Sequence, residues 1–275
     1  MNDITSRLPL SVFLITKNCG EWLDAVLTAV RGVAEIIVVD SGSTDDTLTI
    51  ARQHGARIIT QPFLGYGQQK QVALDACTQP WVLNLDGDEV LDDTLRTAMF
   101  DLVRADDPAV IGGEVKFRDW FIGVPANKRT RAITRVRLWR RGAGRFLAEQ
   151  IVHESVQLDA GRVVRLPGWV EHYGVESVGL RVDKINRYSS LRAELDANRG
   201  KSPSALKLFL IFPLRFWRNY LLRRAFLDGR RGLIQSMASA YYAFLIEAKK
   251  FEAAERARLK LESSSQSPQS SQGGL

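Results

Sequence analysis

The chain has 275 residues, of which 45% are hydrophobic and 25% are charged. These are ordinary globular values, and the length is enough for one sizeable core with an appendage. The two cysteines, Cys19 and Cys77, provide no spaced set for a disulfide framework or a zinc site, so a reducing compartment is expected.

The net charge of +7 is clustered along the sequence. Ten Lys or Arg and a single acid, Asp119, lie between Lys116 and Arg145. A second group consists of Arg215, Arg218, Arg223, Arg224, Arg230 and Arg231. Such clusters suit the phosphates of nucleotides, nucleic acids or anionic lipids, although solvated surface charge is the alternative for each residue.

Strand-like and helical segments alternate from residue 9 to about residue 105. The N-terminus lacks a basic segment followed by a long apolar core, which favours a first strand over a secretion signal. The predicted strands are 10–15, 36–39, 57–60 and 81–85, and the predicted helices are 21–30, 47–54 and 67–76. Ser43-Thr44-Asp45-Asp46 fits a capping box before the second of these helices. This order predicts an α/β fold with a parallel sheet and right-handed crossovers.

The pattern changes after Asp107-Pro108. Segments 112–122, 134–139, 162–166 and 168–173 are typical of strands without intervening helices, and they predict a β-rich insertion that closes over the edge of the sheet. From Val178 onward the patterns are helical. Residues 262–275 are of low complexity and are predicted to be disordered.

The region 205–246 is apolar enough to raise the question of whether it spans a membrane. Its longest uncharged stretch, Gly232 to Ile246, is shorter than the roughly 20 apolar residues that a span needs, so no transmembrane helix is expected. The aromatic and aliphatic residues of 208–221, interleaved with arginines, favour an interfacial amphipathic helix. Packing of the same stripe on a protein core remains an equal alternative.

Three acids follow the apolar run that starts at Trp81. Asp86 and Asp88 flank Gly87, and together they are placed to hold a hard cation at the carboxyl end of a buried strand. The alternative is a strand followed by an acidic helix cap. Polar residues also end the first two strands, with Thr16 and Asn18 after one and Asp40 and Ser41 after the other.

Parallel strands present these ends at one edge, so the groups are expected to converge on one crevice. Asp40 is then placed to accept hydrogen bonds from a base or ribose, and Lys70 adds a cation near a helix start. The loop around Gly65 and Gly67 is neither a dinucleotide fingerprint nor a Walker pattern, which disfavours Rossmann dehydrogenases and P-loop NTPases.

These motifs together resemble family 2 glycosyltransferases of the GT-A fold. The resemblance rests on the segments 13–18 and 37–45 and on Leu85-Asp86-Gly87-Asp88-Glu89, and it continues weakly through 152–154 and 171–173. The segment 226–232 resembles the C-terminal signature of one bacterial subgroup. Within the family, the segments 67–70 and 86–89 are most similar to bacterial lipopolysaccharide core β-glucosyltransferases. The resemblance implies a GT-A (nucleotide-diphospho-sugar transferase) fold with residues 8–105 as the nucleotide-sugar-binding half, 106–177 as the acceptor-side half, 178–261 as a C-terminal helical region and 262–275 as a tail.

The resemblance also implies roles for single residues. The nucleotide-sugar would be bound by Thr16, Asn18, Asp40, Ser41, Lys70 and Asp86, and Mg²⁺ or Mn²⁺ by Asp86, Asp88 and His153. His172 is the alternative histidine ligand. Glu154, with Glu149 as second candidate, would be the base that deprotonates the acceptor hydroxyl, although the Glu-Asp pair common in relatives is absent here.

The expected function is inverting, metal-dependent transfer of a hexose, with glucose favoured, from a UDP-sugar to a saccharide of the lipopolysaccharide core or a related lipid-linked acceptor. The expected location is cytoplasmic, peripheral on the inner face of the cytoplasmic membrane, with an anionic membrane surface and no nucleic acid among the partners. Two alternatives remain open, a sugar-1-phosphate nucleotidyltransferase and a basic nucleic-acid-binding module.

Overall fold

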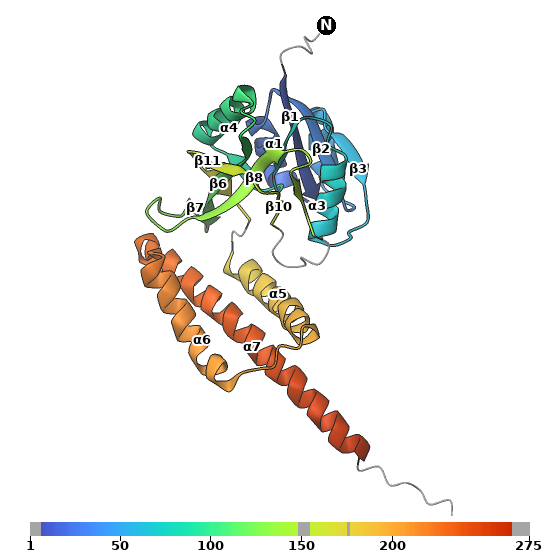
Figure 1. The fold of residues 1–275 in the computed structure, drawn as a ribbon. Coiled ribbons are helices and arrows are strands. Elements are labelled where there is room, and N and C mark those ends of the chain that lie inside the picture. The colour runs from blue at the N-terminus through green and yellow to red at the C-terminus, as the bar shows by residue number, and fades with distance from the viewer. Residues whose placement is uncertain (1–6, 148–154, 175–176, 266–275) are drawn as a thin grey trace, which may run out of the picture. The chain divides into compact units, whose positions relative to one another are not determined.

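The computed structural model describes residues 7–147, 155–174 and 177–265 of the chain. The chain divides into two compact units, which we call unit 1 (Met1–Glu176) and unit 2 (Ser177–Leu275). Unit 1 contains the sheet, and unit 2 is helical (Figure 1).

The first half of unit 1 is the predicted alternation of strands and helices. The strands are β1 (Leu8–Thr16), β2 (Val33–Asp40), β3 (Arg57–Thr60) and β4 (Trp81–Asn84), and the helices are α1 (Gly20–Ala29), α2 (Thr47–Gln53) and α3 (Tyr66–Asp75). They lie in the order β3-β2-β1-β4, and every pair among them is parallel. The predicted parallel sheet is therefore confirmed, while the capping box is wrong. The N-cap of α2 is Asp46 and not Ser43, and Asp46 makes no side-chain capping bond. The N–H and hydroxyl of Ser43 bond to Asp40 instead.

The second half of unit 1 continues this sheet. After β5 (Glu89–Leu91) and α4 (Asp93–Ala105), the strands β6 (Val110–Phe121), β8 (Ile133–Arg140) and β12 (Val170–His172) extend it in the order β4-β8-β6-β12-β5. The short strands β7 (Val124–Pro125) and β11 (Arg162–Arg165) pair with β6, and β9 (Gly144–Arg145) pairs with β10 (Gln157–Leu158). The predicted β-rich insertion thus widens the sheet rather than closing over its edge.

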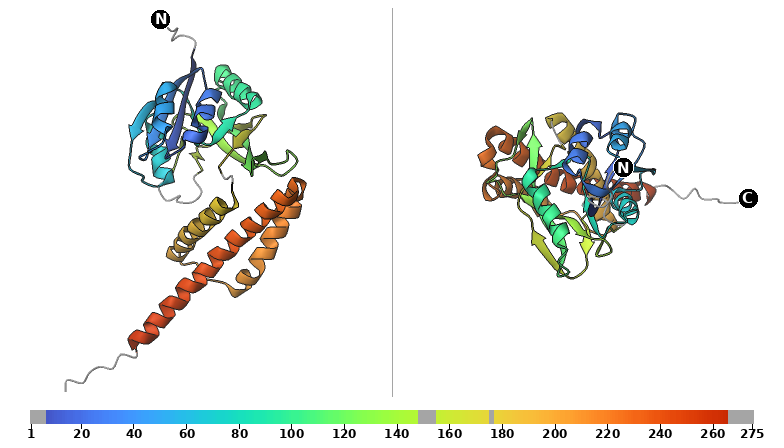
Figure 2. Two further views of the ribbon diagram at one scale, coloured as in Figure 1. Left: turned by 180° about the vertical axis from the view of Figure 1, so that it is seen from behind. Right: turned by 90° about the horizontal axis from the view of Figure 1, so that it is seen from above.

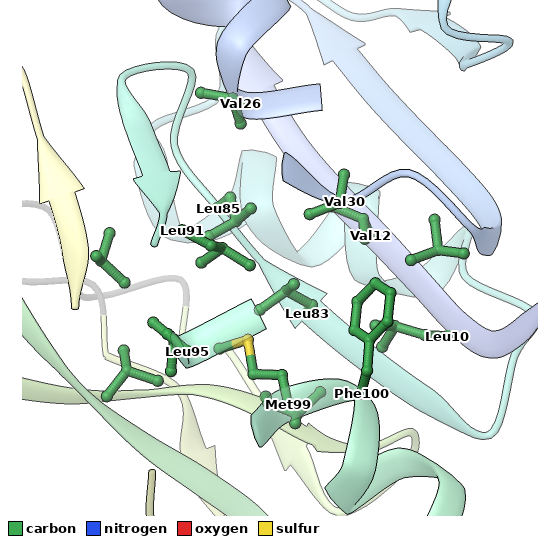
Figure 3. Close-up of a cluster of buried hydrophobic side chains, with 14 of the residues drawn as sticks. Leu10, Val12, Val26, Val30, Leu83, Leu85, Leu91, Leu95, Met99 and Phe100 are labelled. Atoms are coloured by element: carbon green, nitrogen blue, oxygen red, sulfur yellow. The ribbon is translucent and has the colours of Figure 1, made fainter. Parts of the chain in front are cut away.

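Apolar side chains cover both faces of the sheet. On one face, residues of β1 and β4 such as Leu10, Val12 and Leu83 pack with α1 and α4, whose Val26 and Met99 are fully buried (Figure 3). On the other face a second cluster joins β1, β2 and β8 to α3; it contains Phe13, Ile37, Val39, Ala73 and Trp139. Alternation along β1 sends neighbouring side chains to opposite faces, as a strand with both faces buried requires. The core thereby fixes the strand ends that carry the polar residues.

The described residues of unit 2, 177–265, form three long helices and two short ones. The long helices are α5 (Val178–Asn198), α6 (Ala205–Trp217) and α7 (Gly229–Ser265), with a π-helical turn η2 (Arg218–Leu222) and a 3₁₀ turn η3 (Ala225–Asp228) between the last two. Both α5 and α6 pack along α7 (Figure 2). Helix α7 continues to Ser265, past the predicted start of the tail at 262, and residues 266–275 lie outside the described part. No helix in the described residues has the length and apolar content to cross a membrane.

Candidate active site

Asp40 ends β2, where the backbone register places it beside Thr16 of β1. Its Oδ1 accepts hydrogen bonds from the hydroxyls of Thr16 and Ser43, and its Oδ2 accepts the backbone N–H groups of Gly42 and Ser43, both at 2.8 Å. Burial alone would raise the pKa of Asp40, but these bonds outweigh it and the pKa lies below its usual value. A carboxylate has about four acceptor positions, so the loop itself occupies those of Asp40.

The loop after β1 is held to the loop after β2. Asn18, in the left-handed region at φ 53°, donates its backbone N–H to Ser43 Oγ and accepts the N–H of Thr44 on its side chain at 2.8 Å. The Asp45 carboxylate accepts the N–H of Gly20 at 3.0 Å. Ser41 Oγ accepts Gln69 Nε2, which links the same edge to α3. Thr16, Asn18, Asp40 and Ser41 thus lie together, as the sequence predicts, and they form one hydrogen-bonded rim.

Asp86 follows β4 and lies between two buried cations. Its Oδ1 is 2.9 Å from Lys70 Nζ of α3, and its Oδ2 is 3.2 Å from Arg137 Nη2 of β8. Both cationic side chains are only 3% exposed. Burial would raise the pKa of Asp86, but Lys70 and Arg137 hold it well below its usual range. Both carboxylate oxygens of Asp86 are therefore engaged with cations of the chain.

Glu89 belongs to the same buried network. It forms an ion pair with Arg137 and accepts the backbone N–H of Asp86, while Arg137 also donates to Asn84 at 2.7 Å. Burial, reinforced by the charge of Asp86, raises the pKa of Glu89 to about 7 against the opposing charge of Arg137. The network ties the start of the Asp86-Gly87-Asp88 turn to β8 and so fixes its position.

Asp88 has a different environment. Its Oδ2 lies 3.8 Å from Nε2 of His172, and both side chains are about one-third exposed, at 32% and 34%. The other ring nitrogen of His172 lies 2.8 Å from an oxygen of Asp119. Burial alone would lower the pKa of His172, but Asp119 and Asp88 raise it to about 9. This carboxylate and this imidazole therefore face each other across a short gap at the strand ends.

Gly174 keeps that gap open, and Gly87 lets the turn before it pass the β1 loop. A β-carbon on Gly174 would lie 2.6 Å from His172 Nε2 and 2.7 Å from Asp88 Oδ2, and would fill the space between them. A β-carbon on Gly87 would lie 2.7 Å from that of Cys19, so the turn can pass the β1 loop only without a side chain. A carboxylate oxygen suits either Mg²⁺ or Mn²⁺, and the imidazole nitrogen would add a ligand for Mn²⁺ once the ring has lost its proton.

Strand β12 brings His172 to this place. It lies between β6 and β5, with His172 in register with Asp119 on one side and Glu89 on the other. The next residue, Tyr173, donates its backbone N–H to the backbone carbonyl of Asp88 at 3.0 Å and stacks on Trp22 with ring centroids 3.9 Å apart. These contacts anchor the end of β12 against the Asp86-Gly87-Asp88 turn.

Three predicted site residues, Glu149, His153 and Glu154, lie outside the described residues. The described chain before them ends in a fixed position, because Phe146 packs edge-on against Phe13 and Trp139 and its N–H bonds to Gln71 at 2.8 Å. The roles of the three residues stay predictions.

Sequence reasoning included Arg137 only as one member of the basic cluster 116–145, suited to the phosphates of a ligand or to solvated surface charge. The spacing on β8 held a signal, because Arg137 lies two residues before Trp139 and so on the same face of the strand. Gln69 was given no role, yet it is fully buried and bonds to Ser41 and to the carbonyl of Gln61. Both residues are buried and hold a predicted site residue in place, Gln69 through Ser41 and Arg137 through Asp86.

Comparison with known proteins assigns the class. Residues 11–162 match the family described as Glycosyl transferase family 2. The chain belongs to this family, and it is a glycosyltransferase. The predicted enzyme class is confirmed, and with the strand order described above so is the predicted α/β, GT-A fold class.

Among individual proteins, the chain is 36% identical to the lipopolysaccharide core biosynthesis glycosyltransferase LpsC of Rhizobium meliloti, over 90% of this chain and 93% of the relative. It is 32% identical to an uncharacterized glycosyltransferase of Rickettsia felis, over 87% of this chain and 88% of the relative. A solved mannosyltransferase from Pyrobaculum calidifontis, in complex with GDP-Man and Mn²⁺, aligns with a TM-score of 0.46 and 18% identity, covering 96% of this chain and 81% of that one. The chain is thus related to a lipopolysaccharide core glycosyltransferase over most of its length.

Proposed function

We propose that this glycosyltransferase is inverting and metal-dependent, and that it transfers a hexose from a UDP-sugar to a saccharide of the lipopolysaccharide core or a related lipid-linked acceptor. Glucose is the first hexose to test. Similarity to LpsC over 90% of the chain supports the acceptor class. The resemblance of the strand-end motifs to β-glucosyltransferases supports the donor.

The open pair formed by Asp88 and His172 is the observation that carries metal dependence. Their facing atoms are 3.8 Å apart, and Gly174 leaves the space between them free of a side chain. In the described residues no group of three His, Cys, Asp or Glu is arranged to hold a metal. Diphosphate oxygens would complete the coordination, as is usual for Mg²⁺ sites that use one or two protein carboxylates, and His153 remains the predicted additional ligand.

The remaining residues divide into a nucleotide side and an acceptor side. On the nucleotide side, Asp86 positions Lys70 and Arg137 close to the proposed diphosphate, and the rim around Asp40 takes the base and ribose. On the acceptor side, Glu154, or Glu149 as second candidate, removes the proton of the acceptor hydroxyl. At the same time the hydroxyl oxygen of the acceptor attacks the anomeric carbon from the side opposite the departing UDP. A divalent ion, when bound, neutralises charge that develops on the diphosphate.

A lipid-linked acceptor is confined to a membrane, so we also propose that the enzyme works at the inner face of the cytoplasmic membrane. The basic residues and the apolar residues of 205–231 support this location.

Release of UDP or GDP, measured over a series of nucleotide-sugars with a core saccharide as acceptor, tests the proposal. We expect UDP release, and a loss of at least about 10²-fold in turnover for Asp88→Ala and for His172→Ala, because a bound metal contributes several kcal/mol. Calorimetric titration of Mn²⁺ in the presence of UDP should show the same loss without any turnover. The matched control is Asp93→Ala, which removes an exposed carboxylate from the first turn of α4. Full turnover of folded Asp88→Ala, or of the enzyme in excess EDTA, would exclude the metal.

A further inference from the structure

Helix α6 has two apolar faces, and only one of them is used for packing in unit 2. The structure describes all 13 residues of α6, and none of them is buried. The inner face contains the half-buried side chains Leu208, Ile211, Phe212, Arg215 and Phe216. The outer face, which we call the α6 stripe, consists of five large exposed side chains: Leu206, Phe209, Leu210, Leu214 and Trp217.

The α6 stripe is continuous along the helix. Its members recur every three or four residues, which places them on one side of an α-helix. Phe209 is 78% exposed, Leu206 71% and Leu214 63%, which is unusual for apolar side chains of this size gathered on one face. Exposed apolar residues continue beyond α6 into the two short turns, at Leu221, Leu222 and Phe226.

Polar contacts hold α6 on α7 without the stripe. Lys207 forms an ion pair with buried Glu247 of α7 at 3.1 Å, and Glu247 also accepts the N–H of Ser204 just before α6. At the other end, buried Asn219 donates to Ser239 of α7 at 2.8 Å. The helix is therefore fixed by its inner face and its ends, and the stripe has no part in these contacts.

Positive charge accompanies the stripe. Between Ala205 and Arg231 the sequence has seven Lys or Arg and one acid, Asp228. Burial, and then the charges of Arg218 and Arg223, lower the pKa of Arg215, and Arg218 is exposed next to the stripe. An apolar strip beside clustered arginines complements the acyl chains and phosphates of an anionic lipid leaflet.

We propose that the α6 stripe lies in the interfacial layer of an anionic membrane, parallel to its surface, with Arg218 and Arg223 on the headgroup phosphates. At about 1.5 Å per residue, 13 residues span about 20 Å, less than the roughly 30 Å of a bilayer core, so α6 lies along the surface instead of crossing it. Helix α7 supports α6 from the cytoplasmic side. This inference rests on the membrane location proposed above and names the surface that would make the contact, but it uses unit 2 alone and does not involve the donor site.

Flotation of the full-length protein with vesicles tests the proposal. We expect binding to phosphatidylglycerol mixed with phosphatidylcholine, little binding to phosphatidylcholine alone, and weakening by salt. Phe209→Asp with Leu214→Asp, and Arg218→Glu with Arg223→Glu, should each reduce binding at least about 10-fold. The matched controls are Leu259→Asp, at an exposed leucine 53% accessible on α7, and Arg52→Glu, at an exposed arginine on α2; both should bind like the wild type.

Insertion has its own readout in Trp217, the one tryptophan in the sequence of unit 2. Brominated lipids should quench part of the tryptophan fluorescence, and Trp217→Phe should remove that part. Three outcomes would overturn the proposal. The first is equal binding to neutral and anionic vesicles. The second is a fall in melting temperature for Phe209→Asp, which would mean that protein covers the stripe. The third is a dimer of the wild type that Phe209→Asp loses in analytical ultracentrifugation, which would mean that a second copy covers it. Failure of UDP release in solution would leave vesicle binding unaffected, so the two proposals fail separately.

Discussion

The ends of β2 and β4 carry acids at the same edge of one sheet, but the two ends are neutralised differently. At the end of β2, Asp40 is satisfied by hydroxyl and amide groups of its own loop and of Thr16. At the end of β4, Asp86 is satisfied by full charges from two other elements, Lys70 of α3 and Arg137 of β8. Asp88, two residues later, has an imidazole across a gap.

This difference separates acids that hold the structure from an acid that is placed to meet a ligand. A carboxylate with every acceptor position filled by its own chain is already stabilised, and binding through it requires the loss of an existing bond. Asp88, about one-third exposed, instead faces the ring of His172 at 3.8 Å, a longer contact, and an ion that binds there replaces this contact and the proton on the ring. Of the acids at the two strand ends, Asp88 therefore has the least to give up on binding an ion. The roles of Asp40 and Asp86 in binding the nucleotide-sugar, and of Asp86 in binding the metal, stay predictions.

The largest expected effect follows from breaking the charge network at β4. Arg137→Met removes the guanidinium that buried Glu89 and half-buried Asp86 share, and removal of one partner from a buried ion pair costs about 3–5 kcal/mol. The free energy of unfolding, measured in urea, should fall by that amount. Arg135→Met is the matched control, because Arg135 is exposed two residues earlier on the same strand, and its change should stay below about 0.5 kcal/mol. Equal stability of the two variants would mean that the network does not hold the turn.

The parallel half of the sheet could be predicted because its signals are local. Apolar runs such as Trp81 to Leu85, separated by helical periodicity, fix both the element type and the parallel order. The way the second half joins the sheet could not be predicted. The pairing of β12 between β6 and β5 depends on contacts between segments far apart in sequence, and no local pattern encodes it.

The same distinction applies to the site. The convergence of Thr16, Asp40 and Asp86 follows from the parallel order, so their proximity could be predicted. Which cation faces which acid could not, because Lys70 and Arg137 reach Asp86 from α3 and β8. His172 was one of two candidate histidines, and only the register of β12 places it beside Asp88.

The carboxylate of Glu154 extends the comparison of acids to the acceptor side of the proposed site. If Glu154 is the base, Glu154→Gln should lower kcat about 10²-fold or more, the usual scale for a lost general base, and leave the KM for the donor unchanged. Steady-state kinetics with a saturating acceptor measure both constants. Glu149→Gln is the control and should stay active. An inactive Glu149→Gln beside an active Glu154→Gln would transfer the role to Glu149.

The smallest effect is expected at β2, where neutral groups surround the acid. Asp40→Asn replaces an acceptor of four hydrogen bonds with an amide that presents N–H groups to some of the same donors, at a cost of about 2 kcal/mol. The pKa of Asp40 is lower in the folded protein than its usual value of about 3.9, so its charge stabilises the fold above that pH, and this contribution is lost as the pH falls through the folded pKa. Thermal unfolding from pH 7 to acid should therefore show a gap between wild type and Asp40→Asn that narrows below about pH 4.

Thr16→Val is the control for that experiment, because it removes one donor to Asp40 and leaves the charge in place. It should cost about 1 kcal/mol, the usual value of one hydrogen bond, with a weaker dependence on pH. Thr16 is also predicted to line the nucleotide pocket, and the same variant separates the two roles. A residue that only supports Asp40 changes the melting temperature and leaves the KM for the donor alone, whereas a direct ligand raises that KM at temperatures where the protein is fully folded. A stability gap for Asp40→Asn that does not change with pH would show that the charge of Asp40 is not what its loop stabilises, and the contrast between the two strand ends would then fail.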